Sequence, residues 1–454
     1  MHTLVTLSNL INLMVKIVIQ KKIKDFNKVI NVDGDKSLSI RSLLIGSQSY
    51  GICKIENLPK SEDVLSTING LRKLGIKIIF RNKNCYLYGN GLNGFNYKKN
   101  IIINAGNSGT FARLLLGLLV KSPFSIKVIG DKSLSRRDFQ RIIYPLEQFG
   151  AKFFSNHKKN LPLKIIGSDY LRPIYYYEKK GSAQCKSSVI LAAMNTPGKT
   201  IINAKKSRDH TELFLKYLNL PIKISQTKKF DRIELTGEKQ FKSFHYIIPG
   251  DISSSAFFIV LTLLLKNSEL KIKDVNINPS RIGFIKIINK MGAKVKFLNK
   301  RKIYGEQIAD IYVKSRKNFK PINCPVELNS NAIDEFLIIF LLASKASGVS
   351  SFKNLEELDK KESPRLKLAS QILKKIGVKI KLGKGSIKIF GNPNLTLNKN
   401  ILIKDYYKDH RIFMTSVIAA LSLGGKWTIE DMESHKSSFP SFISILKKIG
   451  YKFQ

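Results

Sequence analysis

LRKLGIKIIF, at residues 71–80, decides the fold, because variants of this stretch recur along the whole chain. Each copy reads as an apolar helical stretch, a glycine and a short strand. The glycine suits the C-terminal end of a helix, where a left-handed backbone is needed. A degenerate copy, LKYLNLPIKI at 215–224, has Leu220 in the place of the glycine. The further copies are LEQFGAKFF (146–154), INKMGAKVKF (288–297), LKKIGVKIKL (373–382) and LKKIGYKF (446–453).

These repeats predict six supersecondary units, since successive copies lie 70 to 85 residues apart. In the first unit, residues 61–75 have the pattern of a helix, and residues 76–80 and 85–89 have the pattern of strands. The order within a unit is strand, helix, strand, helix and two strands (βαβαββ). Six α/β (α+β) units over 454 residues predict two similar lobes of three repeats each, with a natural boundary near residues 246–250.

The composition is strongly basic, with 78 Lys and Arg against 33 Asp and Glu and a formal net charge of +45. Such a surface attracts anions. A dedicated nucleic-acid surface would be a local patch, whereas Lys, Ile and Asn are abundant along the whole chain. We therefore attribute most of the excess charge to compositional drift, and we expect small anionic ligands and no nucleic-acid partner.

Cysteine usage and the N-terminal segment indicate a reduced, cytoplasmic compartment. No two cysteines form a CxxC pair, so the sequence predicts neither a metal nor a redox site. The apolar run within residues 1–25, a possible extension, is broken by Asn12 and Lys16 and is too short for a membrane span. The four cysteines are Cys53, Cys85, Cys185 and Cys324.

The most polar stretch of each unit lies in one register, at the entrance to the first helix. The hexapeptide GDKSLS occurs there at 34–39 and again at 130–135, where it precedes the second helix of its unit. We interpret it as one device used twice, a glycine-containing loop that leads into a helix whose free N–H groups attract an anion. The residues in this register are Ser37, Gly109, Gln184, Asp251, Asp334 and His410.

Cations and carboxylates accompany these entrances and are predicted to face a common cleft. Lys361, Glu362 and Arg365 are expected to share one helical turn, either as a surface ion-pair network or as an acid/base site in a cleft. His410 is either a structural histidine or part of the site. Guanidinium groups can form two hydrogen bonds at once to a phosphate or a carboxylate, so the predicted ligand carries several phosphate and carboxylate charges. The cations are Lys36, Arg41, Arg113, Arg137, Lys361, Arg365 and Arg411.

The ordered set of motifs resembles the 5-enolpyruvylshikimate-3-phosphate synthase family (3-phosphoshikimate 1-carboxyvinyltransferases) over roughly residues 30–454. The resemblance implies two lobes with an interlobe active site and an N-terminal segment that joins the second lobe, giving lobes at 34–246 and at 1–33 with 247–454. The motifs are GDKSLSIR, NAGNSGTFARLL, GDKSLSRR, SAQCKS, SRDHTE, PGDISSSAFF, IDEF, KES-x-R, DHR and SFPSF.

The activity implied by the resemblance is a cofactor-free transfer by a monomer. The 5-hydroxyl of shikimate 3-phosphate adds to C2 of phosphoenolpyruvate, and the tetrahedral intermediate then loses phosphate. Asp334, Glu362 and Lys36 are the implied catalytic residues. Phosphoenolpyruvate would be held by Lys36, Gly109, Arg113, Arg137, Gln184, Lys361, Arg365 and Arg411. Shikimate 3-phosphate would be held by Lys36, Ser37, Arg41, Ser182, Ala183, Gln184, Arg208, Asp334 and Lys361. The resemblance also implies that Gly109 leaves room for the inhibitor glyphosate.

Two positions depart from the family pattern, and two other functions stay open. Asp138 follows Arg137 where the family has Arg-Pro-Met, and Pro364 interrupts KES-D-R. A UDP-N-acetylglucosamine enolpyruvyl transferase would share fold and chemistry, but it typically uses a loop cysteine, and none lies between Cys85 and Cys185. A nucleic-acid-binding protein on a degenerate scaffold would bind with steep salt dependence and without turnover.

Overall fold

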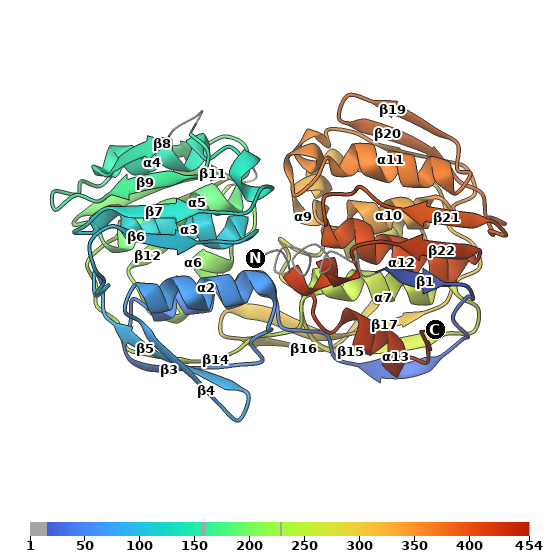
Figure 1. The fold of residues 1–454 in the computed structure, drawn as a ribbon, viewed down its shortest axis with the longest axis horizontal. Coiled ribbons are helices and arrows are strands. Elements are labelled where there is room, and N and C mark those ends of the chain that lie inside the picture. Colours follow the sequence, from blue (N-terminus) through green and yellow to red (C-terminus); the bar gives the residue numbers. More distant parts are fainter. Residues whose placement is uncertain (1–15, 156–158, 228, 454) are drawn as a thin grey trace, which may run out of the picture.

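The computed structural model describes residues 16–155, 159–227 and 229–453. It has two lobes side by side, each with its own hydrophobic core (Figure 1). The first core draws on residues 38–248, and the second on residues 17–32 and 252–451. The predicted α/β class and two-lobe architecture are confirmed. No helix in the described part of the chain is long and apolar enough to cross a membrane.

Three four-stranded sheets surround the core of the first lobe. Their strand orders are β14-β3-β5-β4, β6-β7-β9-β8 and β10-β11-β13-β12. The strands are β3 (Tyr50–Glu56), β4 (Lys77–Arg81), β5 (Asn84–Asn90), β6 (Ile101–Asn104), β7 (Ile126–Ile129), β8 (Lys152–Ser155), β9 (Leu163–Ile166), β10 (Tyr175–Glu178), β11 (Lys199–Lys205), β12 (Ile222–Gln226), β13 (Phe230–Thr236) and β14 (His245–Ile247). The helices are α1 (Lys36–Gly46), α2 (Glu62–Lys73), α3 (Gly109–Leu118), α4 (Gln140–Phe149), α5 (Ala183–Met194) and α6 (His210–Tyr217), with 3₁₀ turns η1 (Leu119–Lys121) and η2 (Leu134–Arg136).

The second lobe repeats this plan with sheets ordered β16-β17-β15-β2, β18-β20-β19 and β1-β22-β21. The strands are β1 (Ile17–Ile19), β2 (Asn27–Ile30), β15 (Glu269–Asn276), β16 (Lys296–Ile303), β17 (Glu306–Lys314), β18 (Val349–Phe352), β19 (Ile380–Gly383), β20 (Ser386–Phe390), β21 (Asn400–Ile403) and β22 (Lys426–Ile429). The helices are α7 (Ile252–Leu264), α8 (Gly283–Lys290), α9 (Asn329–Ala332), α10 (Phe336–Ala343), α11 (Arg365–Lys375), α12 (His410–Leu423) and α13 (Phe442–Lys448), with η3 (Val326–Leu328), η4 (Glu356–Lys360) and η5 (Met432–Ser437).

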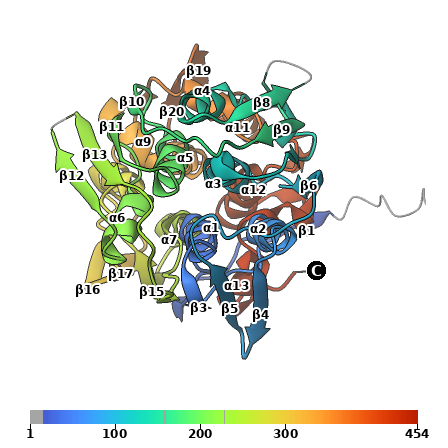
Figure 2. The same ribbon diagram turned by 90° about the vertical axis from the view of Figure 1, so that its left-hand side faces the viewer.

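The first helix of each unit lies inside its lobe. Figure 2 shows the sheets of the first lobe around the outside and α1, α3 and α5 nearer the middle. In the second lobe, α10 and α12 are buried along their whole length, as expected for helices that are apolar on all sides. The second helices, such as α2 and α11, keep one exposed face. Because the first helices are buried, their N-terminal residues are held in fixed positions.

The repeat marker is a left-handed residue after each second helix. The five glycines all have positive φ, from +81° at Gly377 to +119° at Gly150. The degenerate copy was misplaced by one residue: Asn219, with φ 55°, occupies the left-handed position, and Leu220 follows it as a buried side chain. Asn is one of the few other residues that tolerate this backbone conformation.

The chain crosses between the lobes twice. At each crossing, the strand just before the crossing pairs within the lobe that the chain is leaving. β2 precedes α1 in sequence, but it pairs in parallel with β15 of the second lobe. β14 precedes α7, but it pairs in parallel with β3 of the first lobe. β1 pairs antiparallel with β22, so residues 17–19 belong to the second lobe. Of the possible extension at residues 1–25, the first fifteen lie outside the described residues.

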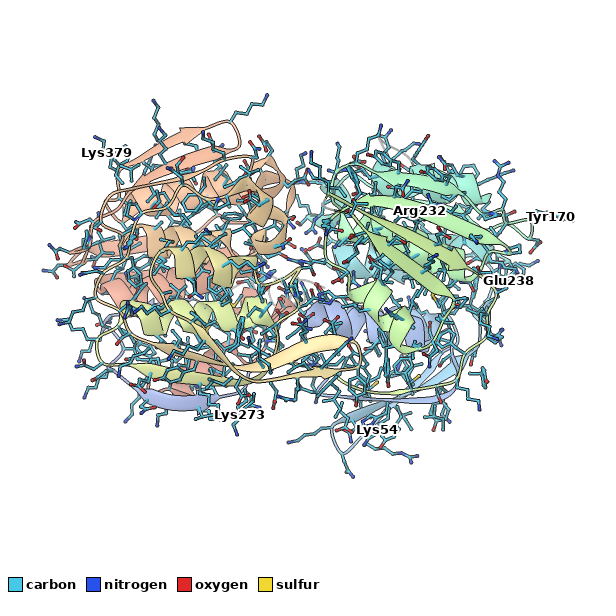
Figure 3. The ribbon with its side chains drawn as sticks, turned by 180° about the vertical axis from the view of Figure 1, so that it is seen from behind. Lys54, Tyr170, Arg232, Glu238, Lys273 and Lys379 are labelled. Carbon is cyan, nitrogen blue, oxygen red and sulfur yellow. The ribbon has the colours of Figure 1, made fainter. Side chains whose placement is uncertain are left out.

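The basic surface has no single centre among the described residues. Figure 3 shows Lys54, Arg232, Lys273 and Lys379 on separate outer parts of the two lobes, and charged side chains extend around both. This distribution agrees with charge spread along the sequence rather than concentrated in one element.

Candidate functional site between the lobes

The entrances of the buried helices carry polar residues in the predicted register. Five of the six first helices begin with a side chain that accepts a hydrogen bond from the first turn. Glu335 precedes α10 without such a bond. The capping residues are Asp35, Ser108, Ser182, Asp251 and Asp409.

The two GDKSLS copies share an aspartate cap but lead into different structures. The Asp35 carboxylate accepts from the Leu38 N–H at 2.9 Å, and the Asp131 carboxylate accepts from the Leu134 N–H at 2.7 Å. The first copy opens α1. The second opens only the 3₁₀ turn η2, and α4 begins later, at Gln140. The expectation that both copies lead directly into an α-helix was therefore wrong for 130–135.

Asp334 is the centre of a cluster of cations from both lobes. Arg208, from the first lobe, lies 2.6 Å from its carboxylate. Lys361 and Arg365 lie 3.3 and 3.4 Å from it, and Arg411 donates to its backbone carbonyl at 2.8 Å. Burial raises the pKa of this carboxyl, but the four cations outweigh burial and hold the pKa well below its usual range. Asp334 is therefore ionised near neutral pH.

Glu362 is a second carboxylate that both lobes contact. It pairs closely with Arg365, and Arg137 of the first lobe lies 3.7 Å away. The Ser133 hydroxyl donates to its backbone carbonyl at 3.0 Å. Burial raises the pKa of Glu362, but Arg365, Arg137 and other nearby cations lower it well below its usual range. Two ionised carboxylates thus lie where the lobes meet.

Lys361, Glu362 and Arg365 do not share a helical turn, contrary to expectation. Lys361 has an extended backbone after η4, and Arg365 is the first residue of α11. Pro364 disfavours helical backbone at Ser363, so α11 does not extend back past it to Glu362 and Lys361. The resulting loop still places all three side chains around the two carboxylates.

Arg113 and Gln184 form the part of the site next to Arg137. The Arg113 guanidinium donates to the Gln184 side chain at 2.7 Å and lies over the ring of Phe139. Burial, with a smaller effect of Arg137, lowers the pKa of Arg113 to about 10, so it stays charged at neutral pH. A Cβ at Gly109 would lie 2.9 Å from an Arg137 nitrogen and 3.1 Å from an Arg113 nitrogen. Gly109 therefore leaves room for these guanidinium groups.

The remaining predicted residues lie along the first lobe, and the side chains of Lys36 and Arg41 bond to partners within it. Lys36 pairs with Asp63 at 2.8 Å. Arg41 is buried and donates to the hydroxyls of Thr211 at 2.9 Å and Ser187 at 3.1 Å. Lys36 is also near enough to Glu362 to help lower the pKa of that carboxyl. Ser37, Ser182 and Ala183 stand at the entrances of α1 and α5, where Ser182 caps its helix.

Two carboxylates that orient site cations were missed from the sequence. Asp409 accepts from Arg365 at 2.9 Å and from the Arg411 N–H at 2.9 Å, and the Ser363 hydroxyl donates to it at 2.8 Å. Asp63 pairs with Lys36. Asp409 stood directly before His410 and had the signal of a helix N-cap, whereas Asp63 gave no signal because it comes from the second helix.

Most of these cations are matched by a protein carboxylate. Anionic ligand oxygens can take the place of such a carboxylate, since Arg and Lys bind phosphates in the same geometry. The arrangement suits a small ligand with several negative charges and a reaction in which two carboxylates move protons.

The sequence matches the family model for EPSP synthase (3-phosphoshikimate 1-carboxyvinyltransferase) over residues 20–446. The chain belongs to the EPSP synthase family. A 3-phosphoshikimate 1-carboxyvinyltransferase of Ruthia magnifica subsp. Calyptogena magnifica is 40% identical over 423 residues, covering 93% of this chain and 95% of that protein. One from Zymomonas mobilis is 34% identical over 440 residues, covering 96% and 97%.

Solved structures with a similar fold include a member of the same family. An EPSP synthase from Acinetobacter baumannii has a TM-score of 0.84 and 32% identity, covering 97% of this chain and 99% of that one. The enolpyruvyl transferase NikO from Streptomyces tendae has a TM-score of 0.75 with the same coverage. Its identity is 12%, so this second likeness concerns the fold alone.

The two departures from the EPSP synthase pattern have local structural roles. The exposed Asp138 side chain accepts from the Gln140 N–H at 2.7 Å, at the start of α4. Arg137 instead donates to the Asn107 side chain at 2.8 Å. Pro364 stands immediately before α11, where a missing N–H costs little.

Proposed function

We propose that this member of the EPSP synthase family transfers the enolpyruvyl group of phosphoenolpyruvate to the 5-hydroxyl of shikimate 3-phosphate and releases phosphate. The observation that carries the proposal is the pair Asp334 and Glu362, ionised carboxylates that cations from both lobes surround. The family membership and the names of the relatives support the substrates.

The substrates are proposed to bind by replacing protein carboxylates as partners of the cations. Arg137, which contacts Glu362, and Arg113, which contacts Gln184, lie next to Gly109 and suit a small phosphorylated acid. We propose Lys36, Gly109, Arg113, Arg137, Gln184, Lys361, Arg365 and Arg411 for phosphoenolpyruvate. We propose Lys36, Ser37, Arg41, Ser182, Ala183, Gln184, Arg208, Asp334 and Lys361 for shikimate 3-phosphate.

The proposed chemistry moves two protons. The substrate hydroxyl gives up its proton as its oxygen bonds to C2 of phosphoenolpyruvate, and C3 gains a proton. The tetrahedral intermediate then loses a proton from C3 as its bond to phosphate breaks and phosphate leaves. Asp334 and Glu362 are the proposed proton carriers. Both are ionised without substrate, so either can first accept a proton. Substrate anions that draw away Arg208 or Arg137 would raise the carboxyl pKa values and make it easier for the carboxylates to accept a proton, and return of the cations would make it easier to give the proton back. Lys36 would neutralise charge that develops on the leaving phosphate.

The organisation of the active protein is also proposed. We assign the lobes to residues 34–246 and to residues 1–33 with 247–454, because the two cores divide close to these positions. We propose a cytoplasmic monomer that uses no cofactor and binds no nucleic acid. Size-exclusion chromatography with light scattering would test the monomer directly.

The choice of the molecule that accepts the enolpyruvyl group tests the proposed function. Purified protein would be given phosphoenolpyruvate with either shikimate 3-phosphate or UDP-N-acetylglucosamine, and phosphate release would be measured. We expect release with the shikimate ester alone, and a large loss in Lys36→Met. Release with only the sugar nucleotide would overturn the substrate assignment. No release from folded protein, together with salt-dependent binding of nucleic acid, would overturn the reaction.

A further inference from the structure

The two crossings between the lobes lie against each other. Gly34 and Gly250 form an isolated antiparallel bridge. The Asp35 N–H donates to the Pro249 carbonyl at 2.8 Å, and the Asp251 N–H donates to the Asp33 carbonyl at 3.0 Å. Each crossing ends in a helix cap, Asp35 for α1 and Asp251 for α7. A change in the orientation of one lobe relative to the other would therefore move both capping residues, Asp35 and Asp251.

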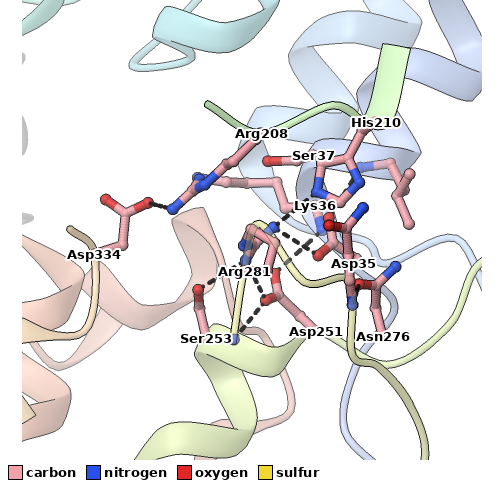
Figure 4. A network of polar contacts seen from close by, with 12 residues as sticks. Asp35, Lys36, Ser37, Arg208, His210, Asp251, Ser253, Asn276, Arg281 and Asp334 are labelled. Atoms are coloured by element: carbon pink, nitrogen blue, oxygen red, sulfur yellow. Dashed lines mark hydrogen bonds and ion pairs between the residues drawn. The ribbon is translucent and has the colours of Figure 1, made fainter. Parts of the chain in front are cut away.

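Arg281 joins the two caps through its buried guanidinium (Figure 4). One terminal nitrogen lies 3.0 Å from the Asp35 carboxylate. The other lies 3.2 Å from the Asp251 carboxylate and donates to the Ser253 hydroxyl at 2.9 Å. Burial disfavours its charge, but the two carboxylates outweigh burial and raise its pKa above the ordinary value. Arg281 is thus a permanent cation between two carboxylates that start helices in different lobes.

Both carboxylates that pair with Arg281 also contact the start of α1, where Lys36 and Ser37 are assigned to substrate. The second Asp35 oxygen caps α1, which opens with Lys36 and Ser37. The second Asp251 oxygen accepts from the Lys36 N–H at 3.4 Å. The first turn of α1 is therefore held against the second lobe by Arg281 through both carboxylates.

A third contact reaches the loop of Arg208. His210, the first residue of α6, has its Nε2 3.4 Å from Arg281. Because Arg281 is always a donor, this nitrogen is the acceptor, and the His210 Nδ1–H donates to Glu306 at 2.7 Å. On the other side, Ser253 donates to Glu335, the neighbour of Asp334. The network therefore touches the loops on both sides of the Arg208–Asp334 pair.

We propose that Arg281 is a positioning residue that fixes Lys36, Ser37 and Arg208 in register with Asp334 when the lobes meet. It does not touch the reacting atoms; it acts through Asp35, Asp251 and His210. The inference rests on the proposed function. A planar guanidinium can join two carboxylates and a hydroxyl at once, whereas a lysine ammonium is a single point charge.

The test is a set of variants at Arg281 and Asp35 with the steady-state assay for both substrates. Arg281→Gln removes the connection, and Arg281→Lys keeps the charge without its geometry. Asp35→Asn keeps an oxygen for the Leu38 cap but weakens the pair with Arg281. Ile288→Val, in the buried face of α8, is the control for a general loss of stability. Thermal unfolding of each variant shows that it is folded.

We expect kcat/KM for shikimate 3-phosphate to fall about 100-fold in Arg281→Gln and about tenfold in Arg281→Lys, because small displacements of positioning groups cost rates of this size. Ile288→Val should stay within about twofold of the wild type despite a lowered Tm. If Arg281 acts through Asp35, the double variant Asp35→Asn/Arg281→Gln should be little worse than Arg281→Gln alone.

Two results would overturn the inference: a folded Arg281→Gln protein within about threefold of the wild type, or losses that multiply fully in the double variant. If Arg281→Gln does not fold, Arg281→Lys, Asp35→Asn and their combination decide the question by the same criterion. A wild-type protein that shows no turnover would instead contradict the proposed function.

Discussion

Replacing Asp334 by Asn should destabilise the free protein, because Asp334 holds cations of both lobes together. In Asp334→Asn, Arg208 and Lys361 lose the carboxylate that pairs with them, whereas Arg365 keeps Asp409 and Arg411 keeps the backbone carbonyl. Breaking a fully buried pair costs about 3–5 kcal/mol, and an exposed pair contributes about 0–1 kcal/mol.

The Asp334 site lies between these limits, since its side chain is 14% exposed and that of Lys361 is 30% exposed. We therefore expect a loss of about 2 kcal/mol, or a Tm lowered by about 4–8 °C for a lobe of this size. The pKa of Asp334 is lowered by folding, so its contribution is complete above the unfolded pKa of about 3.9 and is lost as the pH falls toward the folded value. The deficit of the variant should therefore be full at pH 7 and shrink in acid.

Differential scanning calorimetry with and without inorganic phosphate would test this reasoning. Phosphate should raise the Tm of Asp334→Asn more than that of the wild type, since the anion can occupy the place of the lost carboxylate. Asp405→Asn, whose side chain is 81% exposed, is the matched control and should change nothing. An Asp334→Asn Tm within 1 °C of the wild type at pH 7, as a rough threshold set by the same scaling, would refute the argument.

Three further outcomes are expected. Gly109→Ala should weaken inhibition by glyphosate about tenfold or more, because the new Cβ would lie 2.9 Å from an Arg137 nitrogen; unchanged inhibition would contradict this. His410 should stay neutral from pH 5 to 8 in NMR titrations, since burial and nearby cations lower its pKa to about 3. Its unfolded form charges below about pH 6.5, so stability should fall by up to about 2 kcal/mol at pH 5, and less in His410→Gln. Asn219→Ala should cost about 1 kcal/mol in urea unfolding, because Asn219 has a left-handed backbone; no loss would argue against that requirement.

The sequence was informative wherever the structural signal was local. A left-handed residue that ends a helix and a polar cap that begins one depend on a few neighbouring residues, so the repeat marker and the helix entrances were found. The error at Leu220 came from requiring a glycine where Asn219 serves. The helical turn expected for residues 361–365 was wrong because Pro364 disfavours helical backbone at Ser363 and α11 begins only at Arg365, a limit that the sequence could have shown.

The sequence pattern did not predict pairings between residues that are far apart in the sequence. The pairing of β2 with β15 joins strands that lie in different repeats, and no local periodicity specifies such a pairing. Asp63, the partner of Lys36, and Arg281, the partner of Asp35, come from other helices or from the other lobe. Their roles follow only from the folded arrangement.

Single-turnover phosphate release by Glu362→Gln tests most directly the claim that two carboxylates between the lobes move the protons. Enzyme in excess over phosphoenolpyruvate, with saturating shikimate 3-phosphate, would be sampled by rapid quench. Glu357→Gln is the matched control, because Glu357 also pairs across the lobes, with Arg141 at 3.4 Å, but its side chain is 50% exposed. We predict that Glu362→Gln is about 10²–10⁴-fold slower than the wild type while Glu357→Gln is nearly unchanged. A Glu362→Gln rate within about threefold of the wild type would contradict the claim, since loss of a general acid or base costs far more than that.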